Sequence, residues 1–141
     1  MSETDSALAR ELLAGRPVLA FTKGDSMRPL LETGKTRVLI VRVEGELSRN
    51  DLPLYRRPSG QYVMHRIIRS DQTHYYTRGD NRCGLEKVPK DWVLGVVREI
   101  TRKNRTFSVK DRRYRQYVAL WNMIYPLRWG LYKLRSVWNR L

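Results

Sequence analysis

Cysteine and histidine are scarce in this chain of 141 residues, which contains one cysteine, Cys83, and two histidines, His65 and His74. A single cysteine excludes an intramolecular disulfide framework and is typical of proteins in a reducing compartment. So few thiols and imidazoles also exclude a zinc or iron–sulfur site built on cysteines. We therefore expect a protein that uses neither a metal nor a cofactor.

Long apolar segments are also absent, since no run of 18 or more apolar residues occurs. Such a run is what a membrane-spanning helix requires. The N-terminus begins with acidic residues and lacks the basic and apolar segments of a secretory signal peptide. These absences predict a cytoplasmic protein without an N-terminal membrane anchor.

Acidic residues are half as frequent as basic ones, because 14 Asp and Glu stand against 28 Lys and Arg, for a net charge of +14. A strong positive charge favours anionic partners such as nucleic acid, phosphate or an anionic membrane surface. The charge is concentrated at the C-terminus, where residues 112–141 contain seven basic residues and no acidic one. The sequence thus predicts a mildly basic domain followed by a strongly basic tail.

The remaining pattern divides the chain into three parts. Residues 1–16 are typical of a short amphipathic helix in which Leu8, Leu12 and Leu13 share the apolar face. Residues 17–111 contain short β-forming runs separated by turn residues, which predicts a mainly β, antiparallel, barrel-like or sandwich fold. The seven expected strands cover Pro17–Thr22, Arg37–Val43, Leu52–Arg56, Tyr62–Ser70, His74–Arg78, Val93–Thr101 and Thr106–Val109.

Residues 112–141 have the periodicity of an amphipathic helix. Two apolar stripes are separated by Pro126, which is expected to kink the helix or divide it in two. Basic residues interleaved with tryptophan are typical of a helix that lies on an anionic membrane surface. An alternative interpretation is a helical layer packed on the β domain, with its aromatic residues as core. The stripes consist of Tyr117, Leu120, Trp121 and Ile124, and of Leu127, Leu131, Leu134 and Trp138.

Three segments contain residue types that a hydrolytic site requires. Ser26 lies in Gly-Asp-Ser-Met-Arg-Pro, a setting that can expose a hydroxyl in a fixed pose but is also common in plain turns. A serine hydroxyl is a poor nucleophile unless a base lies within hydrogen-bond reach. His65, expected within a strand, is the candidate base, although a lone strand histidine is more often a packed or surface residue. Asp80, in Arg-Gly-Asp-Asn, and Glu86 are candidate carboxylates that would orient and stabilise the imidazolium.

Taken in order, GDSMRPLL, YVMHRII and YYTRGDN resemble the sequence boxes of the S24/S26 serine peptidase superfamily, in its signal peptidase branch. The resemblance covers about residues 18–101. Histidine at the base position is similar to the endoplasmic-reticulum, archaeal and spore-former members, and the chain resembles a small form without the N-terminal membrane anchor. Gly24 stands where many bacterial members have a hydroxyl residue that binds the oxyanion, and Asp25 adds a negative charge before the serine.

The resemblance implies Ser26 as nucleophile, His65 as general base, and Asp80 and Glu86 as acids of the site. It also implies a mostly β fold that binds a peptide or protein substrate as an added extended strand. The predicted function is a serine endopeptidase of signal or leader peptidase type that cleaves a peptide leader. We expect it in the cytoplasm, with residues 112–141 peripheral at the inner face of the membrane.

Two other classes of function stay open. A catalytically inactive member would keep the groove and act as a peptide-binding module. A basic nucleic-acid-binding domain would use the net charge, but no helix-turn-helix, zinc finger or aromatic RNA-binding box is recognisable, so no specific nucleic-acid partner is expected. The self-cleaving repressors of the superfamily use serine and lysine, and no lysine lies on the strand expected to contain His65.

Overall fold

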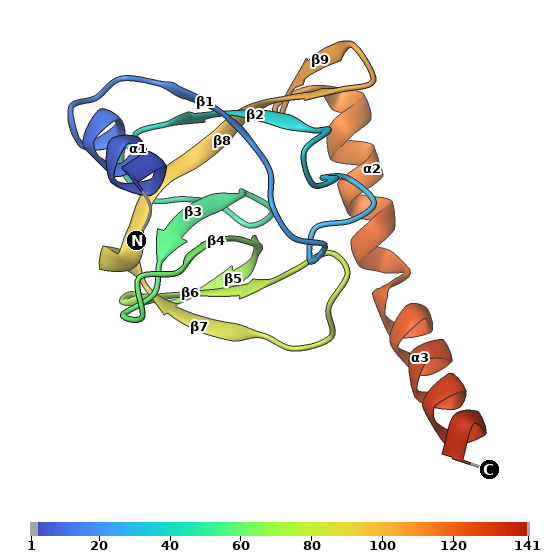
Figure 1. The fold of residues 1–141 in the computed structure, drawn as a ribbon. Helices are drawn as coiled ribbons and strands as arrows, with labels where there is room; N and C mark the ends of the chain where they lie inside the picture. Colours follow the sequence, from blue (N-terminus) through green and yellow to red (C-terminus); the bar gives the residue numbers. More distant parts are fainter. Residues whose placement is uncertain (1–2, 141) are drawn as a thin grey trace. The chain divides into compact units, whose positions relative to one another are not determined.

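The computed structural model describes residues 3–140 and is mainly antiparallel β, with one helix at its N-terminal end and two at its C-terminal end (Figure 1). This confirms the fold class expected from the sequence at that level. The chain divides into two compact units, one ending at Val109 and the other beginning at Lys110. All strands belong to the first unit and both C-terminal helices to the second.

The larger sheet of the first unit has the strand order β1-β2-β8-β3-β4, with β9 paired to β8. Its neighbouring strands are antiparallel throughout. β1 and β4 are therefore its outer edges, and each presents backbone groups that no neighbouring strand within residues 3–140 pairs. The strands are β1 (Val18–Phe21), β2 (Arg37–Val41), β3 (Pro53–Arg56), β4 (Tyr62–Met64), β8 (Val93–Arg102) and β9 (Arg105–Ser108).

The smaller sheet contains β5 (Arg66–Ser70), β6 (His74–Arg78) and β7 (Glu86–Pro89), in that order, and a 3-10 turn, η1 (Lys90–Trp92), follows it. The single strand expected over residues 62–70 is in fact two strands, because β4 pairs in the larger sheet and β5 in the smaller one. His65 lies where the chain passes from one sheet to the other, so the expectation that it sits inside a strand is wrong. β7 was not expected from the sequence.

Helix α1 (Glu3–Leu13) packs on the larger sheet through Leu12, which is fully buried. Gly95 on β8 permits this contact, since a Cβ there would lie 3.2 Å from Leu12 and 2.7 Å from the Ile40 side chain. Leu13 is 69% exposed and does not share the buried face, because it lies about 100° around the helix from Leu12. The helix ends at Leu13, and Gly15 in the turn that follows has a φ of +80°, which suits a residue after a helix C-terminus.

The second unit consists of α2 (Arg112–Met123) and α3 (Tyr125–Arg140). The expected division at Pro126 is confirmed, since this residue lies in the first turn of α3, where a missing N–H costs no intrahelical bond. Two residues of α2, Tyr114 and Val118, are buried, whereas none of the described residues of α3 is. Within residues 3–140, no helix combines the length and the apolar character needed to cross a membrane.

Candidate active site

Ser26 lies in the loop between β1 and β2, and the residues that follow it fix this loop in the core. Met27, Leu30 and Leu31 are each at most 4% exposed, so their burial anchors the backbone directly after the serine. Before it, Gly24 turns the chain with a φ of +83°, a conformation that favours glycine. The loop thus holds Ser26 itself half-buried at the surface of the core.

The Gly79-Asp80-Asn81 segment packs directly against the Ser26 loop. The Asn81 N–H donates a 2.8 Å hydrogen bond to the Ser26 carbonyl, and the Asp80 N–H lies 3.3 Å from the Met27 sulfur. A Cβ on Gly79 would lie only 2.6 Å from the Ser26 carbonyl oxygen, a distance that real Cβ atoms essentially never show. Glycine at this position therefore lets two segments far apart in the sequence meet at the serine.

Ser26 and His65, 39 residues apart, form a hydrogen-bonded pair. The distance from Ser26 Oγ to His65 Nε2 is 3.0 Å. His65 is half-buried at the crossing between the two sheets, which directs its ring to the loop after β1. The candidate nucleophile and candidate base that the sequence suggests are thus within hydrogen-bond reach.

A tyrosine links the other side of the His65 ring to Glu86. Tyr55, fully buried on β3, places its hydroxyl 3.4 Å from His65 Nδ1 and donates a 2.6 Å hydrogen bond to Glu86 Oε1. The same hydroxyl lies 3.2 Å from Thr77 Oγ1. Glu86 is brought there by β7, where it pairs with Thr77 across the smaller sheet. The carboxylate connected to the imidazole through hydrogen bonds is therefore Glu86, by way of Tyr55.

The donors and acceptors of this chain fit one consistent arrangement. Because an ionised carboxylate only accepts, the Tyr55 hydroxyl donates its hydrogen bond to Glu86, and its oxygen can accept from His65 Nδ1–H and from Thr77. A proton on Nδ1 leaves Nε2 as the acceptor for the Ser26 hydroxyl. The chain thus favours the tautomer of neutral His65 that can receive a proton from Ser26.

Asp80, the other carboxylate expected in the site, forms a buried ion pair with Arg66. Both Asp80 oxygens accept 2.8 Å hydrogen bonds, from Arg66 Nε and Nη2, and the Asp80 and Arg66 side chains are only 3% and 1% exposed. Arg66 Nη1 also donates a 2.9 Å hydrogen bond to the Asn50 carbonyl. This pair joins the segment that contacts Ser26 to β5 and to the loop before β3.

The environment of His65 favours its neutral form. Burial is the main reason that the pKa of His65 is lowered below its usual 6.5, because a charged ring loses hydration there. The carboxylate of Glu86 opposes this shift, and the nearby Arg57 and Arg82 reinforce it. At neutral pH the imidazole is thus available as a base.

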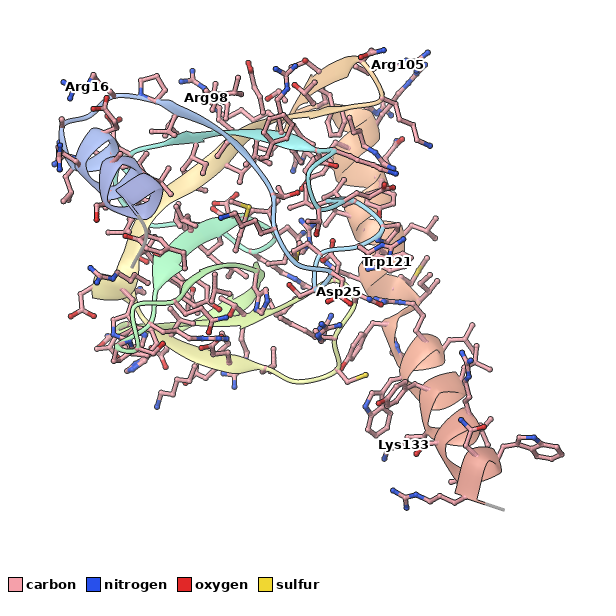
Figure 2. The ribbon with its side chains drawn as sticks, viewed as in Figure 1. Arg16, Asp25, Arg98, Arg105, Trp121 and Lys133 are labelled. Carbon is pink, nitrogen blue, oxygen red and sulfur yellow. The ribbon has the colours of Figure 1, made fainter. Side chains whose placement is uncertain are left out.

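Two arginines offset the acidic side chains around the pair. Arg57 donates 2.9 Å and 2.8 Å hydrogen bonds to the two oxygens of Glu86 and lowers the pKa of that carboxyl, so it stays ionised at neutral pH. Arg82 donates a 2.5 Å hydrogen bond to Asp25 and lowers the pKa of Asp25 in the same way. The negative charge directly before Ser26, labelled at Asp25 in Figure 2, is therefore paired.

A cavity of about 900 Å³ opens beside Ser26 and His65. Its walls come from α1, from β1 and β4, and from the Ser26 loop. Because β1 and β4 are both edge strands of the larger sheet, backbone donors and acceptors lie on both sides of this groove. The lining includes Leu8, Val18, Leu19, Ala20, Phe21, Leu31, Val38, Ile40, Leu54, Tyr62, Val63 and Met64.

Four residues of this site were not singled out from the sequence. Tyr55, Arg57 and Thr77 complete the network around Glu86, and Arg66 is the partner of Asp80. Arg66 and Thr77 lie within the boxes that resemble the peptidases, Arg66 directly after His65 and Thr77 in YYTRGDN. Tyr55 and Arg57 lie on or just after a strand without a recognisable motif, so their roles depend on the pairing of the sheets.

Comparisons with known proteins add no family to this geometry, because no family model, no curated protein and no solved structure matches the chain. Among the described residues, no cluster of three or more His, Cys, Asp or Glu side chains is placed to hold a metal ion. The hydrogen-bonded arrangement of Ser26, His65, Tyr55 and Glu86 is therefore the structural feature that bears on function.

Proposed function

We propose that the protein is a serine endopeptidase of the S24/S26 superfamily, similar to the signal peptidase branch, that cleaves a peptide leader. The observation that carries this proposal is the 3.0 Å hydrogen bond between Ser26 Oγ and His65 Nε2 at the wall of a large groove. A hydroxyl, a neutral base and a group that orients the base are the parts that nucleophilic acyl transfer needs.

In the proposed reaction, Ser26 Oγ attacks the carbonyl carbon of the scissile peptide bond while His65 Nε2 accepts the hydroxyl proton. The resulting imidazolium donates this proton to the leaving amine as the C–N bond breaks, which leaves an acyl ester on Ser26. Water then attacks the ester and gives a proton to His65, and this proton returns to Ser26 as the product acid leaves. Tyr55 holds Nδ1 throughout, and Glu86 stabilises the imidazolium through it.

The negative oxygen of the tetrahedral intermediate needs a donor near Ser26. The backbone N–H of Ser26 is suited to this, since within residues 3–140 it donates to no protein acceptor. Gly24 contributes no hydroxyl of its own, and backbone donors are a common way to stabilise such an oxygen. The backbone N–H of Ser26 would thus take the role of the hydroxyl residue that many bacterial members of the superfamily have.

The groove supports an extended peptide as substrate. On its two sides, β1 and β4 offer edges with which no other strand of residues 3–140 pairs, and an added strand that pairs with them would pass Ser26. Main-chain hydrogen bonds of this kind give affinity, and the apolar side chains of the lining give selectivity. The proposed substrate is thus a linear segment rather than a folded surface.

The direct test is covalent labelling of the full chain with a fluorophosphonate, read as a mass increase of the intact protein. We expect one adduct on the wild type and none on Ser26→Ala or His65→Ala, with circular dichroism showing that both variants keep the fold. Ser6→Ala is the matched control, because this serine lies on α1 and does not line the cavity. Equal labelling of wild type and Ser26→Ala would overturn the assignment.

A catalytically inactive peptide-binding module is the second candidate, and the open edges of β1 and β4 favour it independently of Ser26. A library of linear peptides separates the two functions. Cleavage that Ser26→Ala abolishes supports the endopeptidase. Retention of peptides by both proteins, with no cleavage by either and no fluorophosphonate adduct, supports the binding module.

A further inference from the structure

Helix α3 presents an apolar stripe that no other described residue covers. Leu127, Leu131, Leu134 and Trp138 are 65%, 58%, 67% and 77% exposed. Their spacing of four, three and four residues places them within about 60° of one another around the helix axis. Large exposed apolar side chains on one face are typical of a surface that binds something else.

Basic side chains lie on both sides of this stripe. At about 100° per residue, Arg135 lies some 70° from the centre of the stripe on one side, and Lys133 some 130° from it on the other. Trp129 packs beside Lys133, whose amine lies 3.6 Å from the centre of the indole ring, and Lys133 is labelled in Figure 2. No acidic residue occurs between 112 and 141. The helix is thus apolar on one face, with basic side chains on either side of that face.

We propose that α3 binds an anionic lipid surface, with its axis parallel to the membrane and the stripe inserted between the headgroups. Its 16 residues span about 24 Å, less than the roughly 30 Å of a bilayer core, which fits a helix that lies on the surface. Anionic headgroups would neutralise these basic side chains while the acyl region takes up the leucines and Trp138.

Two other occupants fit these residues less well. A second copy of α3 would cover the stripe, but it would also bring two helices with no acidic residue close together. A nucleic acid would neutralise the basic side chains, yet it would leave the four apolar side chains in water. The lipid surface satisfies both the apolar and the charged part of the helix. This inference does not depend on the proposed peptidase activity.

The experiment is co-sedimentation of the full chain with vesicles of phosphatidylglycerol and phosphatidylcholine, and with vesicles of phosphatidylcholine alone. The test variant is Leu131→Gln/Leu134→Gln, which removes two apolar side chains without a change of charge. We expect about a hundredfold weaker binding to the anionic vesicles, because each buried leucine contributes strongly to partitioning. Wild-type binding should also fall at high salt and be weak on phosphatidylcholine alone.

The matched control is Tyr132→Gln/Ser136→Gln, on the opposite face of the same helix, for which we expect less than a threefold change. Circular dichroism shows whether each variant keeps its helices. Equal loss in both variants, or no binding of the wild type to anionic vesicles, would overturn the proposal. The proposal would also be overturned if light scattering showed a wild-type dimer that only the leucine variant fails to form. Binding of the wild type to duplex DNA in place of vesicles would overturn it as well.

Discussion

Two acid–arginine pairs flank the Ser26–His65 pair, and they differ in burial and in what they contact. Asp80 and Arg66 are almost completely buried, with side chains 3% and 1% exposed. Glu86 and Arg57 are 27% and 31% exposed. The Asp80 segment contacts the backbone of Ser26, whereas Glu86 reaches the His65 ring through the Tyr55 hydroxyl.

This difference in burial and contacts indicates that the two carboxylates have different roles. A buried pair with its own hydrogen bonds contributes mainly to the shape of the protein, because breaking it leaves a charge without compensation. A half-exposed pair contributes little to stability, but through Tyr55 it can fix the tautomer of His65. We therefore infer that Asp80 positions the nucleophile loop and that Glu86 positions the base.

The largest expected effect is a loss of folding stability when the buried Asp80–Arg66 pair is broken. Asp80→Asn keeps the shape of the side chain but leaves Arg66 charged in the core. We expect the free energy of unfolding to fall by about 3–5 kcal/mol, measured by urea denaturation. Glu86→Gln is the control and should cost at most about 1 kcal/mol, since its pair is partly exposed. Equal losses in the two variants would contradict the comparison.

The next effect tests whether the Asp80 region acts on Ser26 through packing. Gly79→Ala places a Cβ 2.6 Å from the Ser26 carbonyl oxygen, so the serine loop must move. We expect a loss of about 1–3 kcal/mol in unfolding free energy together with slower fluorophosphonate labelling. Gly84→Ala is the matched control in the same loop, because its Cβ would meet no atom within 4 Å. If Gly79→Ala labels at the wild-type rate, the contact does not position the nucleophile.

The part of the site that rests on short segments could be predicted from the sequence. The boxes around Ser26, His65 and Asp80 are local patterns of turn and apolar residues, and the structure brings all three segments together. Their order along the chain was therefore sufficient to suggest a common site. The same reasoning supported the mainly antiparallel β class and the break at Pro126.

The rest depended on sheet pairing, which short patterns do not encode. The alternation of residues 62–70 continues without interruption through His65, so nothing marks the change of sheet there. β7 contains only four residues, of which Glu86 and Lys87 are charged, and it resembles a loop until it pairs with β6. Tyr55 on β3 and Glu86 on β7 belong to different sheets, and their side chains meet beside the His65 ring. Long-range pairing therefore decided which acid meets His65.

A smaller effect separates the positioning role of Tyr55 from its role in packing. Tyr55→Phe removes the acceptor of His65 Nδ1–H, so the tautomer that accepts from Ser26 is less favoured. We expect the rate of fluorophosphonate labelling to fall about tenfold at neutral pH, with the protein still folded. Tyr75→Phe is the control, because Tyr75 is equally buried but its hydroxyl accepts from the Leu47 N–H. A similar loss in both variants would assign the effect to packing.

The smallest effect is on the pH dependence of labelling, and it compares the two carboxylates directly. Labelling requires neutral His65, so the rate should be constant well above pH 6.5 and fall as the pH drops through the lowered pKa of His65. Glu86 and Asp80 both raise this pKa, Glu86 more strongly, because their negative charges favour the imidazolium. Glu86→Gln should therefore move the acid limb to lower pH, and Asp80→Asn should move it less.

Glu44→Gln supplies the control for this shift, since it removes the same charge from an exposed turn and should leave the limb in place. The measurement is the labelling rate from pH 4.5 to pH 8 on proteins shown by circular dichroism to be folded across that range. A larger shift for Asp80→Asn than for Glu86→Gln would reverse the assignment, because the charge that His65 senses would then be that of the buried pair. A shift of the acid limb to higher pH in Glu86→Gln would contradict the prediction. Loss of the Glu86 charge and the positive charge of the released Arg57 should both lower the pKa of His65. The direction and the rank of the two shifts thus decide which acid belongs to the base.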